Sequence, residues 1–232
     1  MNAARLARAP GLAYPRRMER LLVFDLDGTL VDSAPDIHAA LNRVLVARGL
    51  APYDLPAVKA MIGDGARVLL ERAFGGRGQA FEAAALDVFL ADEDISQARL
   101  TAPFPGIAPA MDSLAEAGWR FAVCTNKPEG PARALLASLG LGGRFAAIGG
   151  GDSFPVRKPD PGHLLATIAA AGGKPGAAVM VGDHRNDVRA AAGAGLPCIF
   201  AAWGYGPHEM AEGAPIAAAP SDLPRLAAAL RG

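Results

Sequence analysis

The 232-residue sequence has few cysteines, few aromatic residues and no net charge, and each deficit excludes a class of protein. Two cysteines, Cys124 and Cys198, are too few for a disulfide framework in a chain of this length, which favours a reducing, cytoplasmic location. Lysine plus arginine and aspartate plus glutamate each number 23, so no general attraction to nucleic acid or to an anionic membrane is expected. No uncharged apolar run reaches the ~18 residues of a membrane span.

Residues 1–20 differ from the rest of the chain because they are rich in arginine and contain no acidic residue before Glu19. An Arg-rich, acid-poor leader is one pattern of a transit peptide. Two prolines and a glycine interrupt the amphipathic helix that such a leader forms. We therefore expect a disordered extension, or a translation start at Met18, in preference to a transit peptide.

Apolar runs alternate with helical segments of about ten residues along most of the chain, which is the pattern of a parallel sheet with right-handed helical crossovers. Because the runs are apolar throughout, the sheet is expected to be covered on both faces. The strands are expected at residues 21–24, 119–124, 145–148, 177–181 and 197–201.

The block between Thr29 and Leu100 shows helical periodicity and no strand pattern. Its helices are expected at residues 36–48, 57–62, 66–74 and 79–94. This block is therefore predicted to be a small all-helical insertion.

Polar residues follow several of the predicted strands. Asp25 and Asp27 end the first strand, and their two-residue spacing points both side chains in one direction if the extended geometry persists. The other polar residues near strand ends or in loops are Thr125, Asn126, Lys158, Asp183 and Asp187. The carboxyl ends of strands form the site in open α/β sheets.

These residue types suit phosphoryl transfer. Clustered carboxylates are costly unless a cation neutralises them. Oxygen ligands without histidine or cysteine spacing favour Mg²⁺ over zinc. A lysine and a hydroxyl beside Mg²⁺ form a site for a transferring phosphoryl group.

Four segments, in this order, resemble the four motifs of the haloacid dehalogenase superfamily of phosphohydrolases. They are residues 23–33 (VFDLDGTLVDS), 124–127 (CTNK), 157–161 (RKPDP) and 181–187 (VGDHRND). The resemblance extends over roughly residues 21–205. Residues 61–73 (MIGDGARVLLERA) resemble the cap segment of phosphoglycolate phosphatases.

The resemblance implies an α/β fold with two parts. The first is a Rossmann-like parallel sheet core, with strand order 3-2-1-4-5, formed by residues 21–33 and 103–232. The second is an inserted all-helical cap domain at residues 34–102. Residues 1–20 remain as the N-terminal extension.

The resemblance also implies a role for each matching residue. Asp25 is the expected nucleophile, which forms an aspartyl-phosphate, and Asp27 is the expected general acid and base. Mg²⁺ is expected on the carboxylates of Asp25 and Asp183 and on the backbone carbonyl of Asp27.

The remaining motif residues are expected to hold the phosphate. Lys158 would neutralise charge on the nucleophile and the phosphate, with Asp187 orienting Lys158 or a metal-bound water. Gly28, Thr125 and Asn126 are expected on the substrate side, where Gly28 lets the backbone approach the phosphate.

Arg67 and the histidines lie outside these assignments. Arg67, in the cap, is expected to pair with a substrate carboxylate, and the alternative is an exposed arginine at a helix start. His184 stands where relatives often have a small hydroxyl residue, and it faces either the site or solvent. Surface or helix-end positions are expected for His38, His163 and His208.

The expected protein is a phosphoric monoester hydrolase that uses Mg²⁺ to hydrolyse a small-molecule phosphate ester. The leading substrate is 2-phosphoglycolate, which gives glycolate and phosphate. Alternatives in the same superfamily are a pyrophosphatase, a nucleotidase, a sugar-phosphate phosphatase and a phosphomutase. A non-catalytic regulatory phosphate-binding module is more remote, because the full set of reactive residues is present. No nucleic-acid or membrane partner is expected, and the chain is expected to be a monomer or a homodimer.

Overall fold

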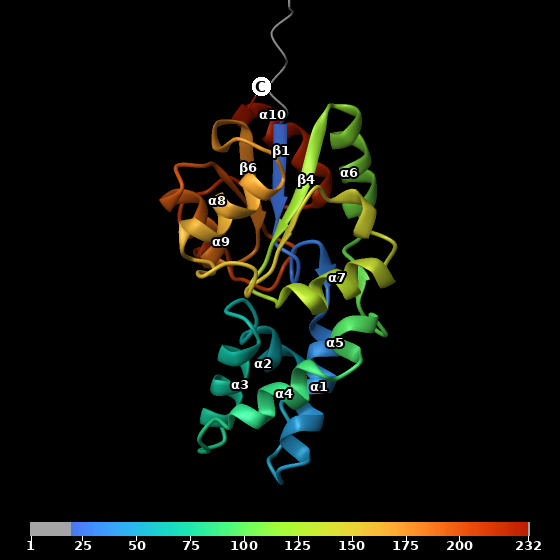
Figure 1. Ribbon diagram of the computed structural model, residues 1–232, viewed down its shortest axis with the longest axis vertical. Helices are drawn as coiled ribbons and strands as arrows, with labels where there is room; N and C mark the ends of the chain where they lie inside the picture. The colour runs from blue at the N-terminus through green and yellow to red at the C-terminus, as the bar shows by residue number, and fades with distance from the viewer. Residues whose placement is uncertain (1–19, 232) are drawn as a thin grey trace, which may run out of the picture.

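The computed structural model describes residues 20–231, and its main body is a six-stranded parallel sheet with helices on both faces (Figure 1). The strands are β1 (Arg20–Phe24), β4 (Trp119–Cys124), β5 (Ile148–Gly149), β6 (Ala178–Gly182), β7 (Cys198–Ala201) and β8 (Ile216–Ala217). Their spatial order is β5-β4-β1-β6-β7-β8. The expected α/β fold is confirmed: the order 3-2-1-4-5 holds for the first five core strands, and β8 adds a sixth at the edge. The expected extension lies outside the described residues, except that Arg20 begins β1.

The central strand β1 is apolar because both of its faces are covered. Leu22 and Phe24 belong to an apolar cluster on one face, whereas Leu21 and Val23 belong to the cluster on the other. All four side chains are buried. The first face is covered by α6 (Ile107–Glu116), α7 (Glu129–Ser138) and α10 (Leu223–Arg231), and the second by α8 (Pro161–Ala170) and α9 (Arg185–Gly193).

An all-helical body lies beyond the carboxyl end of β1 (Figure 1). Its helices share a separate apolar cluster. They are α1 (Ala34–Val46), α2 (Leu55–Lys59), α3 (Ala66–Gly75), α4 (Ala83–Leu90) and α5 (Asp94–Gln97). We refer to this body as the cap. No helix within residues 20–231 has the length and apolar character needed to cross a membrane.

The single helix expected at residues 79–94 is wrong, because the structure has two shorter helices there, α4 and α5. Asp92, between them, accepts a hydrogen bond from the backbone nitrogen of Asp94 at 3.1 Å and pairs with Arg43 at 2.7 Å. An aspartate that bonds nearby backbone competes with helix continuation, which explains the interruption.

Two short strands join the cap to the core. β2 (Val31–Asp32) and β3 (Ala102–Pro103) pair in antiparallel fashion, with Asp32 opposite Ala102. The sequence predicted no strand in this part of the chain, because two residues are too few for an alternating pattern. The two crossings between core and cap therefore lie side by side.

Candidate active site

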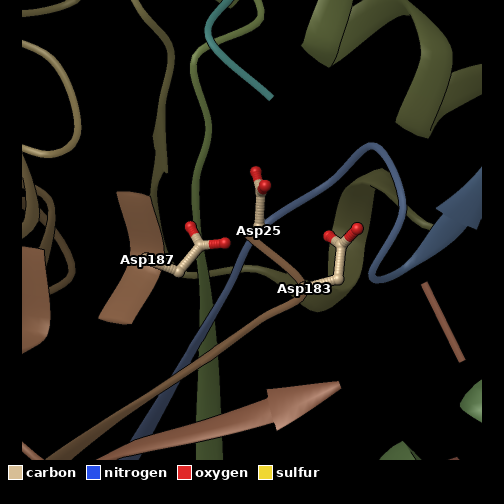
Figure 2. A group of neighbouring side chains, drawn as sticks. All are labelled: Asp25, Asp183 and Asp187. Carbon is tan, nitrogen blue, oxygen red and sulfur yellow. The ribbon is translucent and has the colours of Figure 1, made fainter. Parts of the chain in front are cut away.

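Three aspartates meet where the carboxyl ends of β1 and β6 face the cap. Asp25 directly follows β1, Asp183 directly follows β6, and Asp187 lies in the first turn of α9. All three are buried, and they offer oxygens that lie within 4.8 Å of one another. Figure 2 shows the carboxyl group of Asp187 pointing toward the Asp25 side chain. The fold thus gathers acidic residues that are far apart in sequence.

The ammonium of Lys158 lies between two of these carboxylates. Its Nζ is 2.9 Å from Asp25 Oδ1 and 2.6 Å from Asp187 Oδ1, and its side chain is 1% exposed. Burial acts to lower the pKa of Lys158, but Asp187 and Asp25 outweigh burial and raise this pKa above its ordinary value. Lys158 is therefore a fixed positive charge beside Asp25.

The acidic cluster carries more negative charge than Lys158 balances, since three carboxylates face one ammonium. Burial, followed by repulsion from Asp25 and Asp187, raises the pKa of Asp183 to about 7. Burial also raises the pKa of Asp25 to about 6, although Lys158 opposes this. A bound divalent cation removes such a cost.

The three carboxylates differ in their partners: Asp187 pairs with the Lys158 ammonium, whereas both oxygens of Asp183 accept hydrogen bonds from uncharged groups only. Asp187 Oδ1 pairs with Lys158, and Asp187 Oδ2 accepts a hydrogen bond from the backbone nitrogen of His184 at 3.0 Å. Asp25 Oδ1 accepts from Leu26 and Lys158, whereas its Oδ2 has no hydrogen-bond partner within residues 20–231. The donor set, two buried carboxylates with an uncompensated charge, fits a hard divalent cation such as Mg²⁺.

Gly28 lies against the Asp183 carboxylate, and Thr125 lies in the same pocket as Asp25 and Asp27. Gly28 has φ +87°, and a Cβ at this position would collide with the carboxylate of Asp183. Only glycine suits both the backbone and the space. Thr125, which is 2% exposed, lines the pocket described below, and its Oγ1 accepts a hydrogen bond from the backbone nitrogen of Lys127.

Asn126 connects the core to the cap. Its Nδ2 donates to the carbonyl of Lys158 and to the carbonyl of Gly63 in the cap, each at 3.0 Å. Both donor positions of the amide are thus engaged by protein. Asn126 therefore holds the Lys158 loop and the cap turn in register.

The cap turn makes a second set of contacts, with the start of α9. Asn186 Nδ2 donates to Asp64 Oδ1 at 2.6 Å and to the Gly63 carbonyl at 3.3 Å. The His184 ring lies against Gly63, and its Nδ1 accepts a hydrogen bond from the Asn186 backbone nitrogen as the N-cap of α9. His184 therefore faces the cap turn, and burial lowers its pKa.

A pocket lies between the core and the cap. Asp27 lies on its core side, where Asp27 Oδ1 accepts a hydrogen bond from Ser33 Oγ at 2.6 Å and is 3.5 Å from Lys127 Nζ. The core residues that line the pocket are Asp25, Asp27, Thr125, Asn126, Lys127 and Pro128. The cap contributes Ile37, Ile62, Gly63, Gly65, Ala66, Leu69, Phe89, Leu90 and Ile95.

Arg67, which was expected to contact substrate or else to be an exposed arginine at a helix start, is not among the residues that line this pocket. Its Nε is 2.9 Å from Glu71 Oε1, and its guanidinium lies 5.0 Å from the centre of the Phe81 ring. The side chain is 56% exposed. In this structure Arg67 therefore contacts residues of the cap, Glu71 in its own helix and Phe81.

The loop that follows β7 supports Asp183. The backbone nitrogen of Tyr205 donates to Asp183 Oδ2, and Thr29 Oγ1 donates to Asp183 Oδ1, both at 2.8 Å. Gly204 and Gly206 pack so closely on Asp183 that a Cβ at either position would collide with it.

His163 is buried, so the expectation of a surface position is wrong, whereas the expectation of a helix end agrees with its place in the first turn of α8. Its Nδ1 accepts a hydrogen bond from the backbone nitrogen of Lys158 at 3.2 Å. Burial, with the nearby charge of Lys158, lowers the pKa of His163 to about 4. A single helical position gives no sequence signal for such a contact with a neighbouring loop.

The fold and the site together define a class of capped α/β proteins with a buried acidic centre at the ends of the sheet strands. The family model described as haloacid dehalogenase-like hydrolase matches residues 19–195, which is more than half of the chain. The chain belongs to this family.

The chain is also similar to named members of the family. It is 43% identical over 201 residues to the phosphoglycolate phosphatase of Agrobacterium fabrum, with coverage of 85% of this chain and 86% of that protein. A structure of a predicted phosphoglycolate phosphatase from Haemophilus somnus matches with TM-score 0.81 at 28% identity, covering 91% of this chain and 99% of that one. CbbY from Rhodobacter sphaeroides, in complex with phosphate, matches with TM-score 0.74 at 27% identity, covering 89% and 96%. The expected enzyme class, a phosphoric monoester hydrolase similar to phosphoglycolate phosphatases, is confirmed.

Proposed function

We propose that the protein hydrolyses 2-phosphoglycolate to glycolate and phosphate, with Mg²⁺ as cofactor and Asp25 as nucleophile. The observation that carries this proposal is the environment of Asp25. Lys158 and a backbone nitrogen hold its Oδ1, while its Oδ2 has no hydrogen-bond partner in the described chain. A carboxylate held in this way at the pocket is poised for attack. The similarity of most of the chain to phosphoglycolate phosphatases supports the choice of this ester as substrate.

The reaction proceeds in two steps. In the first, Asp25 attacks phosphorus, the bond from phosphorus to the leaving oxygen breaks, and Asp27 donates a proton to that oxygen. In the second, Asp27 takes a proton from water, the water oxygen attacks phosphorus, and phosphate leaves as the Asp25 carboxylate is restored. The hydroxyl of Ser33, 2.6 Å from Asp27 Oδ1, orients the Asp27 carboxyl group for both transfers.

The phosphoryl group is held by the groups around Asp25. Lys158 offsets the repulsion between the Asp25 carboxylate and a phosphate dianion. Asp187 keeps Lys158 in place through the 2.6 Å contact. Thr125 and the backbone beside Gly28 bind phosphoryl oxygens.

The cofactor would be bound by the carboxylates of Asp25 and Asp183 and by the backbone carbonyl of Asp27. When bound, Mg²⁺ supplies positive charge that stabilises the charge of the transferring phosphoryl group. The free, buried thiols of Cys124 and Cys198 favour a reducing compartment such as the cytoplasm.

Replacing Asp25 tests the nucleophile. We expect Asp25→Asn to lower kcat for phosphoglycolate by about a thousandfold or more, because an amide cannot form the bond to phosphorus. Asp87→Asn is the matched control, since Asp87 is exposed on α4. Thermal unfolding checks that both variants fold. Appreciable turnover by a folded Asp25→Asn variant contradicts the assignment.

A substrate panel tests the ester. Phosphate release is measured with phosphoglycolate, sugar phosphates, nucleotides and pyrophosphate, each with Mg²⁺ and with a chelator. We expect phosphoglycolate to have the highest kcat/KM, and only with Mg²⁺. A flat, weak profile excludes the phosphoglycolate assignment, and a long-lived phosphoenzyme that transfers to a second sugar hydroxyl indicates a phosphomutase.

A further inference from the structure

We infer that Lys127 is the specificity-determining residue that binds the carboxylate of the substrate. The inference rests on the proposed function and deepens it. It assigns carboxylate recognition to the core, at the end of β4, and not to Arg67 in the cap.

The ammonium of Lys127 is buried and has few partners. The side chain is 6% exposed, and its Nζ is 3.5 Å from Asp27 Oδ1. This long contact is the only polar contact of that ammonium with residues 20–231. An ammonium has three donors, and a buried charge with one distant partner is costly. Lys127 thus has donors left for a second anion.

The composition of the pocket makes Lys127 distinctive. It is the only lysine or arginine among the described residues that line the pocket. Every cap residue in the lining is apolar or glycine, including Ile37, Leu69 and Phe89. An apolar wall strengthens an ion pair with Lys127. The same wall offers no hydrogen bonds from cap side chains to the hydroxyls of a sugar or to a base.

The position of Lys127 matches the length of phosphoglycolate. One methylene separates the leaving oxygen of this substrate from its carboxylate carbon. Asp27 protonates the leaving oxygen, and the Lys127 ammonium lies next to Asp27. When the leaving oxygen faces Asp27, the carboxylate therefore lies within reach of Lys127. The site thus has two ammonium groups with separate roles: Lys158 binds the phosphoryl group, and Lys127 binds the carboxylate end, or tail, of the substrate.

The test compares two substrates that differ only in the tail, phosphoglycolate and ethyl phosphate, in the Mg²⁺-loaded enzyme. We expect Lys127→Met to lower the ratio of their kcat/KM values by about 30-fold or more, mainly through the KM for phosphoglycolate. Lys127→Arg, which keeps the charge, restores much of the ratio. Lys174→Met is the control, because Lys174 is exposed at the amino end of β6, away from the pocket.

Each outcome has a distinct meaning. Equal losses on both substrates in Lys127→Met would show that Lys127 acts only through Asp27 and would overturn the inference. An unchanged ratio overturns it as well. A wild-type enzyme that does not prefer phosphoglycolate contradicts the proposed function itself. If thermal unfolding shows that Lys127→Met does not fold, Lys127→Gln, which keeps a polar group, is required to show the same fall in the ratio.

Discussion

The imidazole of His163 supports the loop that carries Lys158. Its Nδ1 accepts the backbone hydrogen bond of Lys158, and the ring packs 5.8 Å from the ring of Phe154. With a pKa lowered to about 4 by burial and the charge of Lys158, the imidazole is neutral at neutral pH. Neutrality is required, since a protonated Nδ1 could not accept this bond.

His163 gives the protein a predictable loss of stability in acid. The unfolded histidine binds a proton near pH 6.5, whereas the folded one resists protonation until about pH 4. Its contribution is complete above pH 6.5 and is lost as the pH falls toward 4. We expect His163→Asn, which keeps an acceptor, to lose about 2 kcal/mol less unfolding free energy between pH 7 and pH 5 than wild type. Urea unfolding of both proteins at both pH values measures this difference. Equal losses of unfolding free energy in wild type and His163→Asn would show that His163 is not the cause of the acid sensitivity.

Single residues also show where prediction from sequence ends. Asp25 and Asp183 were predictable as neighbours, because a parallel sheet brings its carboxyl ends to one edge. The direction of Arg67 was not, since it depends on how α3 packs and on the nearby Glu71. The pocket around Lys127 was not predictable either, because its apolar wall comes from cap residues that only folding brings opposite Lys127.

Among the elements, the turn between α2 and α3 attaches the cap to the core. Gly63 in this turn has φ +125°, and its carbonyl accepts hydrogen bonds from Asn126 and Asn186. A Cβ on Gly63 would collide with the His184 ring. The turn thus docks because it has no side chain at this position.

Replacing Gly63 tests the docking. We expect Gly63→Ala to lower kcat/KM for phosphoglycolate by about tenfold or more, because displacing the turn opens the cap side of the pocket. Gly78→Ala is the control: Gly78 also has a positive φ, +69°, but a Cβ there has no atom within 4 Å. It should cost about 1 kcal/mol of stability and leave kcat/KM unchanged. Steady-state kinetics and thermal unfolding measure both effects, and wild-type kinetics in Gly63→Ala would refute the docking role.

The long buried strands were predictable and the short ones were not. The sequences of β1, β4, β6 and β7 are recognisable as apolar runs, because helices cover both faces of the sheet. β5 was expected at residues 145–148, but the strand consists of Ile148 and Gly149, although Ala146 and Ala147 each form one backbone hydrogen bond with β4. β8 was missed, because it has two residues and Ile216 is exposed. In both cases the pairing partner, and not the local sequence, determines the strand.

For the whole molecule, a balanced net charge hides a local imbalance. The chain has equal numbers of acidic and basic side chains, but within residues 20–231 the cluster of Asp25, Asp183 and Asp187 forms ion pairs with Lys158 alone. A ligand that binds the folded state alone stabilises it by mass action. Global stability is therefore expected to depend on the divalent cation.

Thermal unfolding tests this dependence without any measurement of activity. We expect Mg²⁺ at about one hundred times its Kd to raise the Tm of the wild type by roughly 5 °C or more. The increase should be much smaller in Asp183→Asn and intact in Asp87→Asn. Potassium chloride at matched ionic strength controls for screening. A full increase in Asp183→Asn would contradict the proposed cation site.

Because β2 pairs with β3, the cap is a segment that can be exchanged as a unit. The chain leaves the core at Asp32 and returns at Ala102, which is its direct partner, so the ends of the intervening segment touch whatever its length. Closing such a segment costs little more as it grows. Grafting another cap segment between these two residues would therefore change the shape of the pocket, and with it the shape of the substrate that the pocket accepts. A preference for a carboxylate substrate would stay with the core, because Lys127 lies in the core and not in the grafted segment.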